Sequence, residues 1–171
     1  DGQNWSLPAE EVPNPLVMRR DKPVGNNNIH NCDTNIFYDE KNERLIVYWE
    51  WTNDANSSAF PRGSAIQYLV SYNGTDWGVP VENASEEVKN SGKEIKTFHG
   101  VDLIISAGDD DVYGNAVVSP DARYSDLSPT VTYDSDRDIY LMWANDAGDF
   151  GYNNKNCKVW MRWSNDPLTG W

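Results

Sequence analysis

Copies of one turn pattern constrain the fold of this chain more than any other feature of its sequence. In each copy a strand-like, often aromatic segment leads into a Ser and a polar stretch of Asn, Asp and Gly, and the copy ends at a Trp. Two complete copies run from Tyr68 to Trp77 and from Trp160 to Trp171, and the chain opens inside a third copy that ends at Trp5. Such self-similarity predicts a chain built from successive structural units of one kind.

A second repeated segment precedes each complete turn. Residues 33–39 followed by 44–48 align without a gap with residues 128–134 followed by 139–143. Each copy is typical of a strand, an Asp-led polar turn and a second strand. Short strands without a helical period predict an all-β sandwich or propeller, and the repeat favours a β-propeller, in which each four-stranded blade packs only on its neighbours.

We therefore expect a single β-propeller region over residues 1–171. The blade repeats are predicted at about 13–77 and 100–171, with an exposed hairpin or insertion at about 82–98. The turn Trp residues lie 72 and 94 residues apart, so two to three blades are present. Because a propeller generally needs about four or more blades to close, the ring would be completed by remaining blades of a longer chain or by copies of this chain.

The net charge of −13 argues against two classes of partner. Nucleic acids and anionic membranes are bound through clustered Lys and Arg, and the sequence holds no basic run. No apolar run is long enough to cross a bilayer, so we predict no membrane insertion.

Metal and cofactor chemistry has one candidate in the sequence. Asp109, Asp110 and Asp111 form an acidic loop of the kind that can supply oxygens to Ca²⁺, although the EF-hand spacing is absent. A solvated acidic loop is the default interpretation, so we predict no cofactor, with Ca²⁺ as the alternative. Cys32 and Cys157 lack the spacing of a zinc site; two thiols are the default and one disulfide is left open.

The repeated segments resemble known propellers. The turn from Ser71 to Trp77 is similar to the Asp-box of sialidase-type propellers, and residues 33–39 and 128–134 resemble the inner strands of five-bladed arabinanase- and fructosidase-like glycosidases. The same pattern occurs in propeller domains of phage tail fibres and receptor-binding proteins. The resemblance implies five blades and a location outside the cell or on a virion surface, and it leaves the activity open because the turns are structural.

The glycosidase resemblance also implies a catalytic residue. Asp33 matches the inner-strand Asp that serves as base or nucleophile in that family, and such hydrolysis needs a second carboxyl group facing the same bond. The position of the family's acid is held here by Leu127. Asp126 is adjacent, but a shift of one residue in a strand turns the side chain to the other face.

Several residues are candidates for binding a sugar. Trp49 and Trp51 alternate with Glu50, so the two indoles share one face and an exposed one could stack on a sugar ring while acids and amides bind its hydroxyls. Blade packing is the alternative for the two Trp, and turn capping or loop capping is the alternative for Asp33 and His30. The predicted ligand-binding set is His30, Asp33, Trp49, Glu50, Trp51 and Asp126.

These observations predict recognition of a cell-surface glycan by a glycosidase-like propeller, such as a phage receptor-binding or adhesion component. The first alternative is a glycoside hydrolase that uses Asp33 as one of two catalytic carboxylates. The second alternative is a structural spacer that binds no glycan.

Overall fold

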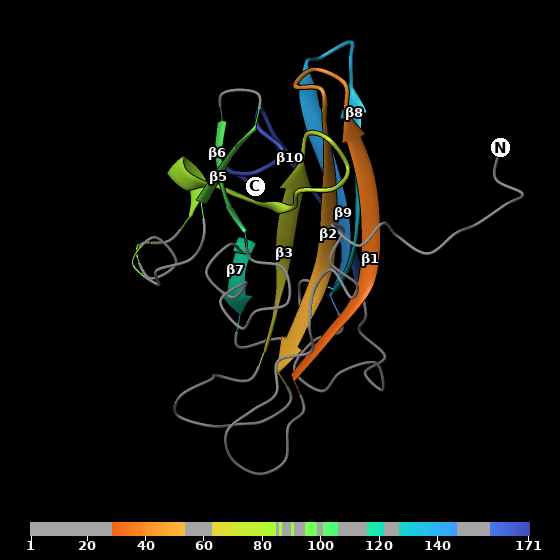
Figure 1. The fold of residues 1–171 in the computed structure, drawn as a ribbon. Helices are drawn as coiled ribbons and strands as arrows, with labels where there is room; N and C mark the ends of the chain where they lie inside the picture. Colours follow the sequence, from red (N-terminus) through yellow and green to blue (C-terminus); the bar gives the residue numbers. More distant parts are fainter. Residues whose placement is uncertain are drawn as a thin grey trace, which may run out of the picture.

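The protein is all-β, as the sequence predicts, and its strands form two antiparallel sheets (Figure 1). The computed structural model describes residues 29–53, 63–84, 86, 90, 95–98, 101–105, 116–121, 127–146 and 158–171. Within these ranges no helix has the length and apolar character needed to cross a membrane.

The first sheet has the strand order β1-β2-β3-β4-β6-β5, and β7 pairs with the part of β3 that β4 leaves uncovered. A short 3-10 helix, η1 (Val81–Asn83), follows β4. The strands are β1 (Ile29–Asp39), β2 (Arg44–Asn53), β3 (Gly63–Ser71), β4 (Gly78–Pro80), β5 (Ile95–Phe98), β6 (Val101–Ile105) and β7 (Ala116–Asp121).

The second sheet has the order β10-β9-β8 and lies with β8 against β1, β2 and β3. Its strands are β8 (Leu127–Asp134), β9 (Ile139–Asp146) and β10 (Lys158–Ser164). The second repeat was expected to begin at about residue 100, but the chain enters the second sheet only at β8. The strands β6 and β7 both join the first sheet. The expected insertion at 82–98 contributes β5, which pairs with β6.

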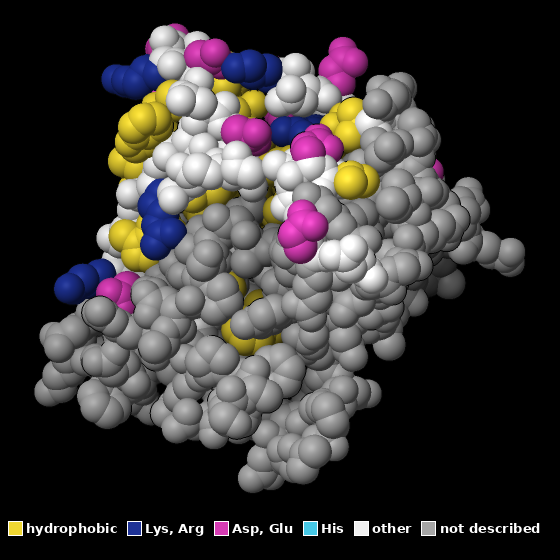
Figure 2. All heavy atoms as spheres, turned by 90° about the vertical axis from the view of Figure 1, so that its left-hand side faces the viewer, with side chains coloured by type: hydrophobic (Ala, Val, Ile, Leu, Met, Phe, Trp, Pro, Cys, Tyr) yellow, Lys and Arg dark blue, Asp and Glu magenta, His cyan; other side chains and the backbone are white. Residues whose placement is uncertain are grey.

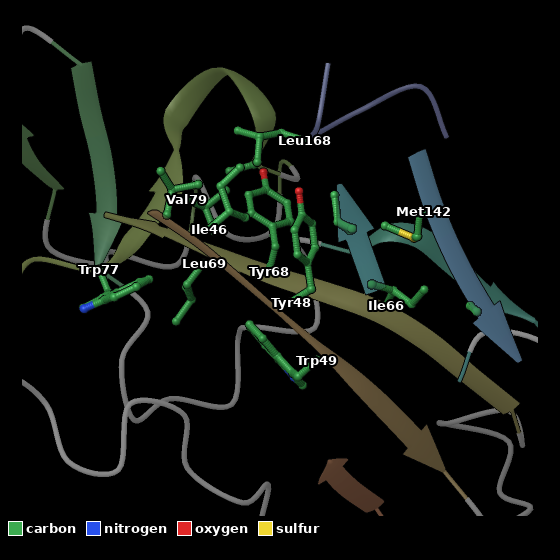
Figure 3. Close-up of a cluster of buried hydrophobic side chains, with 14 residues drawn as sticks. Ile46, Tyr48, Trp49, Ile66, Tyr68, Leu69, Trp77, Val79, Met142 and Leu168 are labelled. Atoms are coloured by element: carbon green, nitrogen blue, oxygen red, sulfur yellow. The ribbon is translucent and has the colours of Figure 1, made fainter. Parts of the chain in front are cut away.

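The part of the hydrophobic core formed by Ile46, Tyr48 and Tyr68 lies between the two sheets, whereas Trp49 and Leu69 lie on the other face of the first sheet (Figure 3). Alternation along β2 turns Ile46 and Tyr48 toward the second sheet, which contributes Val131 and Met142 to the same cluster. The surface drawn in Figure 2 carries both signs of charge close together in its described part, without a basic patch.

The predicted hairpin repeat is reproduced in backbone detail. The described non-glycine residues with positive φ are Asp33, Glu43, Ser128 and Asp138, with φ between 49° and 55°. They form two equivalent pairs in the repeat alignment, Asp33 with Ser128 and Glu43 with Asp138. The first pair lies where each inner strand changes register against its partner, and the second pair ends each hairpin loop. The sequence repeat is therefore also a repeat of β-bulges.

Both predicted Ser-to-Trp turns are closed by their own side chains. In the first turn the Gly74 N–H donates to Ser71 Oγ at 2.8 Å, and the Trp77 indole N–H donates to the Gly74 carbonyl at 3.1 Å. In the second turn the Trp171 indole donates to the Pro167 carbonyl at 3.1 Å. The Trp residues that the repeat highlights thus close the turns.

Replacing Gly170 by Ala should destabilise the protein more than replacing Gly74. Both glycines have a left-handed φ, 76° and 80°, which costs another residue about 1–2 kcal/mol. A Cβ on Gly170 would also lie 3.1 Å from Ser164 Oγ, whereas nothing lies within 4 Å of a Cβ on Gly74. Urea denaturation of both variants measures the difference, and equal losses would show that the turn around Gly170 relaxes freely.

Candidate functional site

Two acidic side chains of the first sheet are joined by one serine of the second. The Ser128 hydroxyl donates to Asp33 Oδ2 at 2.6 Å, and the Ser128 backbone N–H donates to Glu50 Oε2 at 3.0 Å. Asp33 is exposed, whereas the Glu50 side chain is buried. The two carboxylates therefore share one small polar site at the junction of the sheets, and we call Asp33, Glu50 and Ser128 the carboxylate site.

The bulges in the two inner strands create this geometry. Asp33 on β1 and Ser128 on β8 occupy equivalent bulge positions, and both have positive φ. A bulge re-aims a side chain relative to the regular strand alternation, and such features often accompany functional sites. The neighbouring residue Asn35 continues the junction, because its Oδ1 accepts the Val131 N–H at 3.2 Å.

Glu50 is held in an environment that disfavours its charge. It is 3% exposed, and burial raises the pKa of its carboxyl group above the ordinary value. Hydrogen bonds from Thr52 and Ser128 lower the pKa of Glu50, whereas the nearby charge of Asp33 raises it further. The site thus combines a buried acid that retains its proton to higher pH with an exposed acid.

The structure brings together part of the predicted set. Asp33 and Glu50 meet at Ser128 as described. His30 pairs in register with Thr52, two residues from Glu50 along β2, and its side chain lies outside the described set. Asp126, Asp109, Asp110 and Asp111 also lie outside the described residues, so both the prediction of no cofactor and its Ca²⁺ alternative remain predictions. The residues that are described hold no cluster of three or more potential metal ligands.

The expectation of an exposed indole at Trp49 or Trp51 is wrong. The two Trp do share the face of β2 opposite Glu50, as alternation predicts, but they are 1% and 2% exposed. The Trp49 indole donates to Asn31 Oδ1 at 3.2 Å on that face. Neither ring offers a surface for stacking on a sugar. Both side chains are instead packed in the interior, which is the alternative role that the sequence left open for them.

Ser128 is the residue that the sequence analysis missed. A signal was available, since the gapless repeat alignment places Ser128 at the position of Asp33. Leu127, at the position of the glycosidase acid, is buried at 1% exposure and supplies no acid. Glu50 on the neighbouring strand is instead the second carboxyl group of the site.

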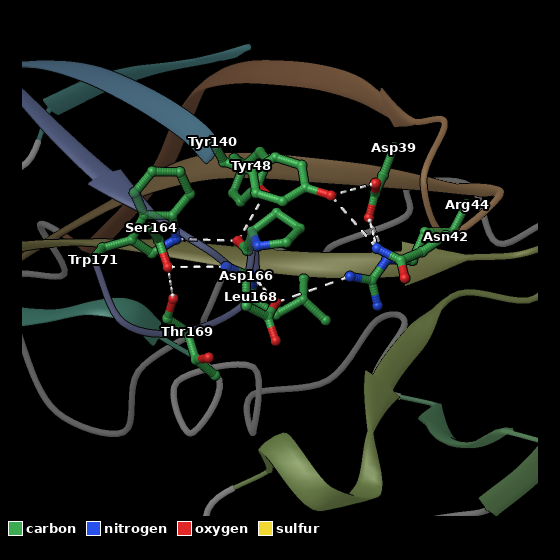
Figure 4. A network of polar contacts seen from close by, with 11 residues as sticks. Asp39, Asn42, Arg44, Tyr48, Tyr140, Ser164, Asp166, Leu168, Thr169 and Trp171 are labelled. Atoms are coloured by element: carbon green, nitrogen blue, oxygen red, sulfur yellow. Dashed lines mark hydrogen bonds and ion pairs between the residues drawn. The ribbon is translucent and has the colours of Figure 1, made fainter. Parts of the chain in front are cut away.

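A second polar cluster lies near the hairpin end of β1 and β2 (Figure 4). The buried Asp39 carboxylate accepts from Arg44 Nε at 2.9 Å, from Asn42 Nδ2 at 2.8 Å and from the Tyr140 hydroxyl at 2.7 Å. Tyr140 belongs to β9, so this cluster ties the two sheets together. All three donors are satisfied within the protein, which favours a structural role for the cluster.

Comparison with known proteins gives one informative similarity. The chain is 34% identical over 170 residues to an A type blood N-acetyl-alpha-D-galactosamine deacetylase from Flavonifractor plautii. The match covers 99% of this chain and 20% of that protein, so the chain spans about a fifth of the length of this curated relative. No family model matches the chain, and no solved structure matches it. The similarity connects the chain to a carbohydrate-acting protein.

Proposed function

We propose that this chain is part of a glycan-binding β-propeller and that the carboxylate site contacts the sugar. The observation that carries the proposal is the hydrogen-bonded link from Glu50 through Ser128 to the exposed Asp33. Similar hairpins, bulges and turns in the two sheets support two neighbouring blades. The similarity to a deacetylase of N-acetylgalactosamine supports an N-acetylated amino sugar as the ligand class.

The site suits a sugar for a chemical reason. An exposed carboxylate accepts hydrogen bonds from sugar hydroxyls, and such charge-assisted bonds are stronger than neutral ones. Ser128 holds Asp33 in position, and Glu50 holds the backbone of Ser128. A ligand would therefore meet a carboxylate whose orientation is already fixed, which lowers the entropy cost of binding.

Replacing Asp33 by Asn should weaken glycan binding. Loss of a hydrogen bond to a charged group reduces affinity by about tenfold or more. Titration calorimetry with an oligosaccharide ending in N-acetyl-D-galactosamine measures the effect. Asp138→Asn is the matched control, because Asp138 is also an exposed Asp with positive φ but lies on the β8–β9 hairpin. Unchanged affinity in the Asp33 variant, or no binding by the native chain, would contradict the proposal.

Hydrolysis of the N-acetyl group is the second candidate function. The relative's name favours it. The site favours it too, because Glu50, whose pKa is raised by burial, lies beside the exposed carboxylate of Asp33. Asp33 would accept a proton from the attacking water, and the products would be acetate and a free amine. Assays for acetate and for new reducing ends separate this reaction from the glycoside hydrolysis that the inner-strand resemblance implies. Release of neither product leaves binding as the function.

A further inference from the structure

A polar cavity lies at the end of the sheets opposite the carboxylate site. Its volume is about 270 Å³, and its walls come from the β1–β2 hairpin, from η1 and from the turn that follows β10. Asp39, at the start of this hairpin, follows Asp33 by six residues of β1, which corresponds to about 20 Å along an extended strand. The cavity is therefore separate from the carboxylate site.

The protein itself holds the inner wall of the cavity in place. Arg44 Nε donates to Asp39 at 2.9 Å, and Arg44 Nη2 lies 3.9 Å from Asp166 Oδ1 (Figure 4). The same Asp166 oxygen accepts the Leu168 N–H at 2.8 Å, and Leu168 is only 3% exposed. Because these groups are already positioned, a ligand would bind with little cost for ordering the protein.

The charges around the cavity favour a neutral ligand. Both cations of its lining have a carboxylate partner, since Arg44 is paired with Asp39 and Lys41 Nζ lies 2.7 Å from Asp138 Oδ1. Glu82 adds a further carboxylate to the lining. An anion entering the cavity would lose hydration without meeting an uncompensated positive charge, so the cavity does not suit an anion.

The rest of the lining matches the chemistry of a sugar. The side-chain amides of Asn83 and Asn165 can donate or accept hydrogen bonds, and sugar hydroxyls can do both as well. Pro167 and Leu168 form a small apolar part of the wall, against which the C–H face of a sugar ring can be buried. Because pockets of about 300–1,000 Å³ hold drug-sized ligands, this slightly smaller cavity suits a single ring.

The equivalent hairpin of the second sheet shows that the turn itself does not require the two cations. The repeat alignment places Lys41 on Asp136 and Arg44 on Ile139. Both hairpins nevertheless pair in the same register and end on a residue with positive φ. Lys41 and Arg44 are therefore features of this cavity and not of the repeated turn.

We propose that this cavity binds a single neutral sugar ring. Glu82 accepts hydrogen bonds from the sugar hydroxyls, and the amides of Asn83 and Asn165 donate to them. Pro167 and Leu168 contact the C–H face of the ring. The proposal rests on a cavity whose walls come from both repeats, and it does not depend on the function of the carboxylate site.

NMR titration of the Asp33→Asn chain with D-galactose tests the proposal, because that substitution removes the sugar contact proposed for the carboxylate site. D-galactose should shift the amide signals of Asn83 and Asn165 saturably. D-galacturonate, which has a carboxylate in place of the C6 hydroxymethyl group, should bind more weakly. Glu82→Ala should weaken D-galactose binding about tenfold, the effect expected for losing a hydrogen bond to a charged group.

Glu40→Ala is the matched control and should leave D-galactose binding unchanged, since Glu40 is an exposed residue of the β1–β2 hairpin that does not line the cavity. Asn165→Phe should abolish binding by filling the cavity, and thermal melting checks that each variant is folded. The proposal is overturned if D-galactose gives no saturable shift or shifts only signals elsewhere in the chain. Tighter binding of D-galacturonate, or equal losses in the Glu82 and Glu40 variants, also overturns it.

Discussion

Replacing Asp39 by Ala is expected to lower the free energy of unfolding by about 3–5 kcal/mol, the range for breaking a buried ion pair by removing one partner. The Arg44 side chain is mostly buried, which lowers the pKa of its guanidinium, but hydrogen bonds and charge interactions with Asp39 and Tyr72 together raise that pKa above its ordinary value. Without Asp39, a buried positive charge and the Tyr140 hydroxyl lose their shared acceptor. Urea denaturation followed by Trp fluorescence measures the loss.

Two further variants isolate the cause of this loss. Asp138→Ala removes the exposed ion pair with Lys41, whose atoms lie 2.7 Å apart, and the exposed hydrogen bond from the Tyr133 hydroxyl, and it should change stability little because solvent screens such contacts. Asp39→Asn keeps the shape and one acceptor oxygen and should fall between the native protein and Asp39→Ala. If Asp39→Ala were no more damaging than Asp138→Ala, the cluster at the hairpin end would not hold the sheets together.

The hairpins and turns were predictable because their signals are local. Alternating apolar residues and the polar segments between them predicted the strand pairs that became β1–β2 and β8–β9. The Ser, Asn and Gly residues of the Ser71 turn bond within a few positions of each other, so their pattern carries the geometry. Asp33 and Glu50 were named for their chemistry, and the structure places both in one site.

The features that were missed depend on contacts between distant parts of the chain. Alternation separated Trp49 from Glu50 correctly, but it could not show that Trp49 and Trp51 are both buried. The link from Ser128 to two acids joins residues 78 and 95 positions apart, and no local pattern encodes it. The pairing of β7 with β3 likewise crosses the expected repeat boundary, because a free strand edge accepts whichever strand reaches it.

Met142→Ala is expected to cost about 2–5 kcal/mol of stability, because truncating a buried Met removes apolar burial and leaves a cavity. Met142 on β9 is fully buried between the sheets, in one cluster with Ile46 and Val131. Met161→Ala on the adjacent strand β10 is the matched control, since it removes the same atoms from a residue that is 52% exposed. Measured by urea denaturation, Met161→Ala should change stability by less than about 0.5 kcal/mol. Equal losses in the two variants would mean that the contact between the sheets contributes no more to stability than the exposed side of β10.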